Sequence, residues 1–115
     1  MYEISHERFE QLASEALSTL PEDLSSQIEN LVIVVEDVAP GRPLYGLYEG
    51  VPLTKRGPTS YSAVMPDRIT LYQTTICGAC GSEAEVATQI RKTVLHEVAH
   101  HFGVSDERLS ELGWA

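Results

Sequence analysis

The sequence predicts an α+β protein in which a small sheet packs on helices. Helical periodicity appears at both ends of the chain and β-branched runs appear in the middle, so the predicted order is helix, strands, helix. A length of 115 residues suits one domain with one hydrophobic core. We therefore predict a single domain over residues 1–115.

An amphipathic helix is predicted over residues 5–20, with Ser5 as its cap. Pro21 should then begin a second, short helix that ends near residue 29, because proline is favoured in a first helical turn. The first helix has apolar residues every three or four positions, as a buried helix face requires: Phe9, Leu12, Ala13, Ala16, Leu17 and Leu20.

Three strands are predicted in the middle of the chain. Residues 31–38 are apolar and β-branched almost throughout, which is typical of a central strand buried on both faces. Residues 44–49 and 68–73 are expected to form the second and third strands. Between them, residues 50–67 contain glycines and prolines and are predicted to form a long surface loop, which in a small domain often has a function.

The longest predicted helix covers residues 82–102, which contain neither glycine nor proline. Ser82 is its candidate N-cap, and Glu85 is placed three residues later as the capping-box partner. Gly103 can end this helix because glycine adopts a positive φ without strain. A last short helix is expected over residues 106–112.

The most informative pattern is H-E-x-x-H-x-x-G-x-x-D, which begins at His96. On a helix, His96 and His100 lie one turn apart on the same face, so both imidazoles can bind one zinc ion. Gly103 lets the chain turn back, and Asp106 can then supply a third ligand, cap the last helix, or do both. Glu97 flanks the metal and is predicted to be the general base that takes the proton of zinc-bound water.

The other two histidines are predicted to lie outside the set of zinc ligands. His101 follows His100 directly and points roughly 100° away around the helix, so we expect it to pack against other residues or to support a ligand. His6 has charged neighbours on the first helix and is expected to be solvated.

The motif over residues 96–106 resembles that of the zincin metallopeptidases, and its glycine and third ligand resemble the metzincin form, in which that ligand is usually histidine. No methionine follows the motif, so the Met-turn of larger metzincins has no counterpart. A wider resemblance, to the small bacterial "minimal" zincin-like metallopeptidases, covers nearly the whole chain. The residues that carry it are Phe9, Ala16 and the segments 20–21, 35–37, 46–53, 66–69 and 106–109.

This resemblance implies a compact zincin-like fold with its active-site helix near residues 82–102, Zn²⁺ as cofactor, and hydrolysis of peptide bonds. Zincins commonly bind the peptide backbone along an edge strand above the zinc helix, so residues 68–73 are a candidate for that strand. The resemblance leaves the natural substrate open.

A structural zinc site is the first alternative. Cys77 and Cys80 together with His96 and His100 match the spacing C-x2-C-x15-H-x3-H of a zinc finger. A finger leaves Glu97 without a role, so a cysteine pair in a loop, reduced or joined as a disulfide, is the favoured interpretation.

Two further alternatives concern function. The bacterial rRNA-maturation endonucleases, which are metal-dependent ribonucleases, share only the spacing of two histidines and a third ligand ten residues after the first. The Glu97 base and the net charge favour peptide over RNA. A degenerate zincin kept as a binding module is the other possibility, and the intact ligands and base speak against it.

Charge and hydropathy narrow the choice of partner. Eight Lys and Arg against 17 Asp and Glu give a net charge of -9, which would repel a phosphate backbone. No segment reaches the roughly 18 to 20 apolar residues of a membrane helix, and the N-terminus lacks the basic and apolar regions of a secretory signal. We expect a cytoplasmic protein that acts on a peptide or protein, with no nucleic acid or membrane partner. The sequence does not predict the oligomeric state.

Overall fold

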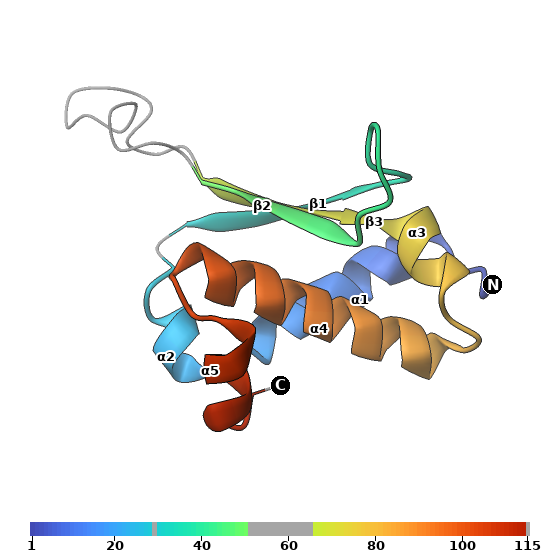
Figure 1. The fold of residues 1–115 in the computed structure, drawn as a ribbon. Coiled ribbons are helices and arrows are strands. Elements are labelled where there is room, and N and C mark those ends of the chain that lie inside the picture. Colours follow the sequence, from blue (N-terminus) through green and yellow to red (C-terminus); the bar gives the residue numbers. More distant parts are fainter. Residues whose placement is uncertain (29, 51–65, 115) are drawn as a thin grey trace, which may run out of the picture.

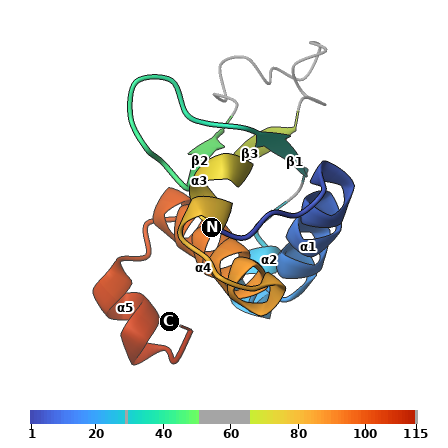
Figure 2. The same ribbon diagram turned by 90° about the vertical axis from the view of Figure 1, so that its right-hand side faces the viewer.

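A three-stranded mixed sheet lies on a layer of helices (Figure 1). This arrangement is seen in a computed structural model, which describes residues 1–28, 30–50 and 66–114. The predicted α+β class is confirmed, and the view turned by 90° shows the helices on one side of the sheet (Figure 2). No helix in the described ranges is long and apolar enough to cross a membrane.

The strands are β1 (Leu31–Glu36), β2 (Gly46–Glu49) and β3 (Asp67–Tyr72). Their order is β1-β3-β2, with β3 parallel to β1 and antiparallel to β2. Most of the predicted loop over residues 50–67 falls on residues 51–65, outside the described residues.

Two predictions about the sheet are wrong. Residues 31–38 do not form a central strand buried on both faces: β1 ends at Glu36, pairs only with β3 among the described residues, and leaves Val32 41% exposed. Residues 68–73 do not form an edge strand, because β3 lies between β1 and β2. A run of β-branched residues predicts that a strand forms, but it does not predict whether that strand lies at the centre or the edge of the sheet.

The N-terminal helices follow the prediction closely. α1 (His6–Ser18) begins after Ser5, whose side chain accepts a hydrogen bond from the Arg8 amide at 3.1 Å. α2 (Glu22–Ser25) begins after Pro21 and is shorter than predicted. Phe9, Leu12, Ala13 and Ala16 of α1 are buried, as the helical periodicity requires.

α4 (Glu83–His101) is the long helix on which the candidate site depends. Ser82 caps it, accepting a hydrogen bond from the Glu85 amide at 3.1 Å. The Glu85 carboxylate accepts from the Gly81 amide at 3.3 Å, so the reciprocal bond of the capping box is shifted by one residue. Before α4 lies α3 (Gln73–Gly78), which is not predicted because three of its six residues are β-branched.

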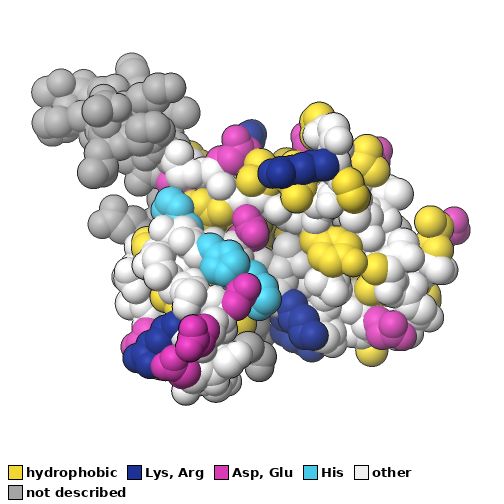
Figure 3. Space-filling view, viewed as in Figure 1, with side chains coloured by type: hydrophobic (Ala, Val, Ile, Leu, Met, Phe, Trp, Pro, Cys, Tyr) yellow, Lys and Arg dark blue, Asp and Glu magenta, His cyan; other side chains and the backbone are white. Residues whose placement is uncertain are grey.

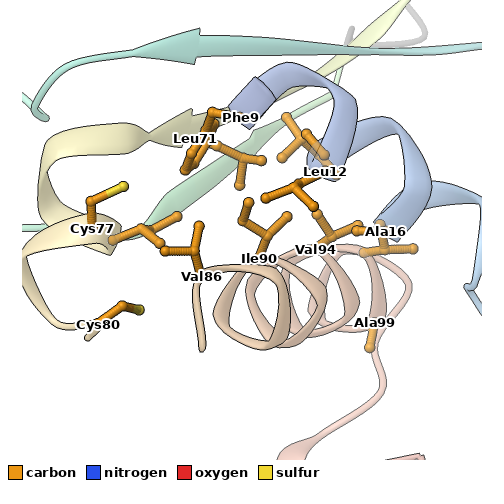
Figure 4. Close-up of a cluster of buried hydrophobic side chains, with 14 of the residues drawn as sticks. Phe9, Leu12, Ala16, Leu71, Cys77, Cys80, Val86, Ile90, Val94 and Ala99 are labelled. Carbon is orange, nitrogen blue, oxygen red and sulfur yellow. The ribbon is translucent and has the colours of Figure 1, made fainter. Parts of the chain in front are cut away.

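The core lies between α1, α4 and the sheet (Figure 4). α4 buries a stripe of residues four positions apart, and these side chains meet Phe9 and Leu12 of α1 and Leu71 of β3. The stripe consists of Val86, Ile90, Val94 and Val98, all with 0% exposure. Because this stripe fixes the rotation of α4 about its axis, it also fixes which residues of α4 face outward.

Candidate metal centre

The outward face of α4 presents His96 and His100 near the C-terminal end of the helix. The two ring centroids are 5.8 Å apart, and the side chains are 41% and 46% exposed. Figure 3 shows histidine and acidic side chains gathered on this face of the molecule. The buried stripe of α4 therefore leaves one turn of the helix free to offer two imidazoles at the surface.

Gly103 reverses the chain after α4. Its φ is +81°, its amide donates to the His100 carbonyl at 3.0 Å, and the Val104 amide donates to the Ala99 carbonyl at 2.8 Å. This pair of bonds is a Schellman motif, which ends a helix on a residue with positive φ. The predicted role of Gly103 is confirmed, and the turn directs the next residues back toward α4.

α5 (Asp106–Glu111) follows this turn and places its first side chain beside the histidines. Asp106 Oδ1 lies 2.9 Å from His100 Nε2 and 3.8 Å from His96 Nδ1. The structure thus brings together the three side chains predicted to be ligands. The alternative prediction, that Asp106 caps the last helix, is wrong, because Ser105 Oγ accepts the hydrogen bond from the Arg108 amide at 3.1 Å.

Glu97 lies on the side of α4 that faces β2, and its Oε1 accepts a hydrogen bond from the Tyr48 amide at 2.9 Å. Residues of an antiparallel strand turn their amides alternately toward and away from the partner strand. The Tyr45 carbonyl accepts from the Tyr72 amide at 2.9 Å, so Tyr48, three residues later, turns its amide away from β3. Glu97 is therefore fixed on the outer edge of β2, and its Oε2 bonds to no described residue.

The donor set suits zinc. Two imidazoles and one carboxylate are a usual combination for a zinc site that keeps a fourth position open. In the described residues, however, no group of three or more His, Cys, Asp or Glu side chains has its donor atoms arranged to hold a metal ion. Instead, the His100 ring and the Asp106 carboxylate are hydrogen-bonded to each other, and His96 Nδ1 lies 3.8 Å from Asp106 Oδ1. The chemistry of the three side chains fits the metal, although their donor atoms are not arranged around a common point.

Cys77 and Cys80 lie at the other end of α4. Cys77 is in α3 and Cys80 follows it, so they are core residues rather than the predicted loop pair, and both are free thiols (Figure 4). From Glu83 to His96 the helix rises about 20 Å, which separates the cysteines from the histidines. Burial raises the pKa of both thiols, which disfavours the thiolate that zinc binds. The zinc-finger arrangement is not formed.

The remaining histidines have different surroundings. His6 is exposed and pairs with Glu10 at 3.1 Å between Nε2 and Oε1, as predicted for a solvated side chain. His101 stacks on the ring of Tyr48, with centroids 4.0 Å apart, and lies within 3.9 Å of Asp67. Tyr48 and Asp67 were not predicted to lie near the site, because no local pattern in the sequence links β2 and β3 to the end of α4.

Comparison with known proteins assigns the chain to a family. A sequence model of the zincin-like metallopeptidase family matches residues 28–114. A solved structure of a conserved hypothetical protein from Thermus thermophilus is similar in fold, with a TM-score of 0.58 and 22% sequence identity, over 94% of this chain and 99% of the other. No curated protein matches the chain. Because the family model covers most of its length, the chain belongs to the zincin-like metallopeptidase family.

Proposed function

We propose that the protein is a zinc-dependent peptidase in which His96, His100 and Asp106 hold the metal and Glu97 is the general base. The observation that carries this proposal is the position of Asp106, whose Oδ1 lies within 4 Å of a ring nitrogen of each histidine. Membership of the zincin-like metallopeptidase family supports it.

Zinc, when bound, would supply Lewis acidity that makes water a stronger acid near neutral pH. The protein would supply the group that accepts the proton of this water, which is the Glu97 carboxylate. The Tyr48 amide holds Oε1 of Glu97, so Oε2 is the oxygen left to accept it. The same carboxylate can then deliver the proton to the leaving amine, which completes hydrolysis of the peptide bond.

The strand order favours β2 over β3 as the strand that a substrate backbone would pair with. β2, and not β3, is the edge strand next to α4 in the described part of the chain. Gly46, two residues before Tyr48, turns its backbone amide and carbonyl outward by the same alternation. We propose that an extended peptide pairs with β2 at Gly46, beside the carboxylate of Glu97.

The test compares the parent protein with Glu97→Gln and, as a matched control, Glu10→Gln, which makes the same change at an exposed carboxylate on α1. Glu97→Gln keeps an oxygen that accepts from Tyr48, so it should keep the fold and the zinc. Cleavage of a mixed library of quenched fluorescent peptides should fall by about 10²- to 10⁴-fold, the usual contribution of a general base. Glu10→Gln should cleave like the parent.

Two results would overturn the proposal. One is full cleavage by Glu97→Gln at unchanged zinc content, which would remove Glu97 from its role. The other is cleavage of RNA but not of peptides by the zinc-loaded parent, which would make the protein a nuclease.

A further inference from the structure

Three polar side chains from three elements meet next to the candidate metal centre. Tyr48 of β2 donates its hydroxyl to Asp67 Oδ2 of β3 at 2.7 Å. The Tyr48 ring stacks on the imidazole of His101, the last residue of α4, with an interplanar angle of 20°. His101 Nε2 lies 3.9 Å from Asp67 Oδ2, which closes the triangle. We refer to Tyr48, Asp67 and His101 as the clamp.

The clamp is partly enclosed. The Asp67 side chain is 14% exposed and that of His101 is 35% exposed. A Cβ atom added to Gly50 would lie 2.8 Å from His101 Cε1, so the backbone just after β2 lies directly against the imidazole. The end of β2 and the end of α4 are therefore in direct contact at the clamp.

Tyr48 connects the clamp to the general base. Its side chain belongs to the clamp, and its amide donates to Glu97 Oε1 at 2.9 Å. Glu97 and His101 are four residues apart on α4 and thus lie on the same face of the helix. One residue of β2 therefore contacts two successive turns of α4, one through its backbone and one through its ring.

Packing alone does not require these residue types. Enclosing a carboxylate, a hydroxyl and an imidazole is unfavourable compared with apolar side chains of similar size, unless every group is well bonded. A bonded polar group instead fixes one orientation, because its hydrogen bonds are directional. Orientation matters for Glu97, since a general base acts only within hydrogen-bond reach of the proton that it takes.

We propose that Asp67 and His101 position Tyr48, and that Tyr48 in turn positions the carboxylate of Glu97 through its amide. All three are positioning residues, not catalytic ones. The inference rests on the proposed function for its effect on catalysis. Its structural part is that the clamp stabilises the hydrogen bond from the Tyr48 amide to Glu97, and this can be measured without any substrate.

The experiment uses Tyr48→Phe, which keeps the ring and removes the hydroxyl, and Tyr45→Phe as its matched control on the same segment. The first measurement is hydrogen exchange of the residue 48 amide, followed by NMR in metal-free protein. It should become about tenfold faster in Tyr48→Phe, the factor that the loss of one hydrogen bond implies, while the Val98 amide in α4 keeps its rate. Tyr45→Phe should change neither.

The second measurement is peptide cleavage by the zinc-loaded proteins, with a quenched fluorescent peptide that the parent cleaves. The kcat of Tyr48→Phe should fall about tenfold with KM and zinc affinity nearly unchanged. The reason is that a misplaced Glu97 destabilises the transition state, in which it takes the proton, and leaves substrate binding unaffected. Asp67→Asn keeps an acceptor for the hydroxyl and should retain most of the kcat, whereas Asp67→Ala should not.

The inference is overturned if Tyr48→Phe lowers only the melting temperature and leaves both the exchange rate of residue 48 and kcat within twofold of the parent. The clamp would then contribute to the stability of the fold and not to the position of Glu97. If the parent cleaves no peptide, the proposed function fails, and the exchange of the residue 48 amide still decides whether the clamp holds Glu97.

Discussion

Ser105 and Asp106 are neighbours in the chain, but their side chains have different partners. Ser105 Oγ accepts the hydrogen bond that caps α5, from the Arg108 amide at 3.1 Å. Asp106 Oδ1 lies 2.9 Å from His100 Nε2 on α4. The capping of the last helix and the third side chain of the candidate metal centre can therefore be tested separately, one residue apart.

Asp106→Ala is predicted to weaken zinc binding by more than the 10- to 100-fold that loss of a supporting residue around a metal typically causes. Two imidazoles alone would lack both the third ligand and its negative charge. Zinc affinity is measured by titration against a competing chelator, with thermal stability followed separately. Asp106→His is the companion variant, since an imidazole at this position should restore part of the affinity.

Ser105→Ala provides the control for this pair. Removing the cap should lower the free energy of unfolding by about 0.5 to 2 kcal/mol and leave zinc affinity nearly unchanged. If Asp106→Ala binds zinc as tightly as the parent, the third ligand is another residue and the assignment of Asp106 is wrong.

Gly103→Ala is predicted to lower the free energy of unfolding by about 1 kcal/mol or more, because a side chain is strained at a φ of +81°. It should also weaken zinc binding, since the Schellman turn returns the chain to place Asp106. Gly78→Ala is the control: its added Cβ has open space and its φ is not positive, so stability and zinc affinity should stay close to those of the parent. Equal effects of the two substitutions on zinc affinity would contradict this account.

The double variant Cys77→Ala, Cys80→Ala is predicted to keep its full zinc stoichiometry after dialysis. Both thiols are buried in the core at the far end of α4, so they are too distant from His96 to share a metal with it. Alanine is preferable to serine here, because serine would enclose a hydroxyl at an unfavourable cost of about 1 to 3 kcal/mol. Loss of zinc from this variant would instead indicate sulfur ligands.

The ion pair between Arg8 and Glu83 predicts a pH dependence of stability. The Arg8 guanidinium donates from Nε to Glu83 Oε1 at 3.1 Å and from Nη2 to Oε2 at 3.3 Å, which lowers the pKa of Glu83. A lowered pKa in the folded state means that the stabilisation is complete above the ordinary glutamate pKa and is lost as the pH falls through the lowered value.

Glu83→Gln should therefore lower the melting temperature modestly at pH 7, since both side chains are about two-fifths exposed and the pair is well solvated. The difference from the parent should shrink as the pH falls through the lowered pKa of Glu83. A difference that stays the same size from pH 7 down to the acid limit of the folded state would show that packing, and not charge, accounts for it.

The helices other than α3 could be predicted from the sequence because their signals are local. Ser5, Ser82 and Gly103 mark the ends of α1 and α4 by hydrogen bonds and backbone angles that depend on nearby residues only. The histidine pair and Glu97 follow from helical spacing in the same way. Their convergence with Asp106 was predictable because one tight turn connects α4 to α5.

The sheet order and the surroundings of Glu97 could not be predicted, because they depend on contacts between distant parts of the chain. The composition of β1 suggests a central strand, yet β3, which contains Arg68 and Thr70, occupies the middle. Tyr48 and Glu97 are 49 residues apart, and nothing in the sequence near either one indicates the other. Even the residue type of Tyr48 gives no signal, since its contact with Glu97 uses the backbone amide.

The hydrogen bond between Glu97 and the edge of β2 also affects how readily two copies of the protein can associate through their sheets. An exposed strand edge can accept a strand from another molecule, and a charged side chain placed at the edge is one way in which proteins prevent such growth of the sheet. The Glu97 carboxylate accepts the hydrogen bond of the outward Tyr48 amide and would repel the carbonyl group of an incoming strand at that position. Pairing with β2 is therefore confined to the short stretch around Gly46, where the substrate is proposed to bind, and a longer sheet shared with a second copy of the protein is disfavoured by the same carboxylate that is proposed to activate water. Glu97→Ala, which frees that amide, should aggregate on concentration more readily than Glu97→Gln.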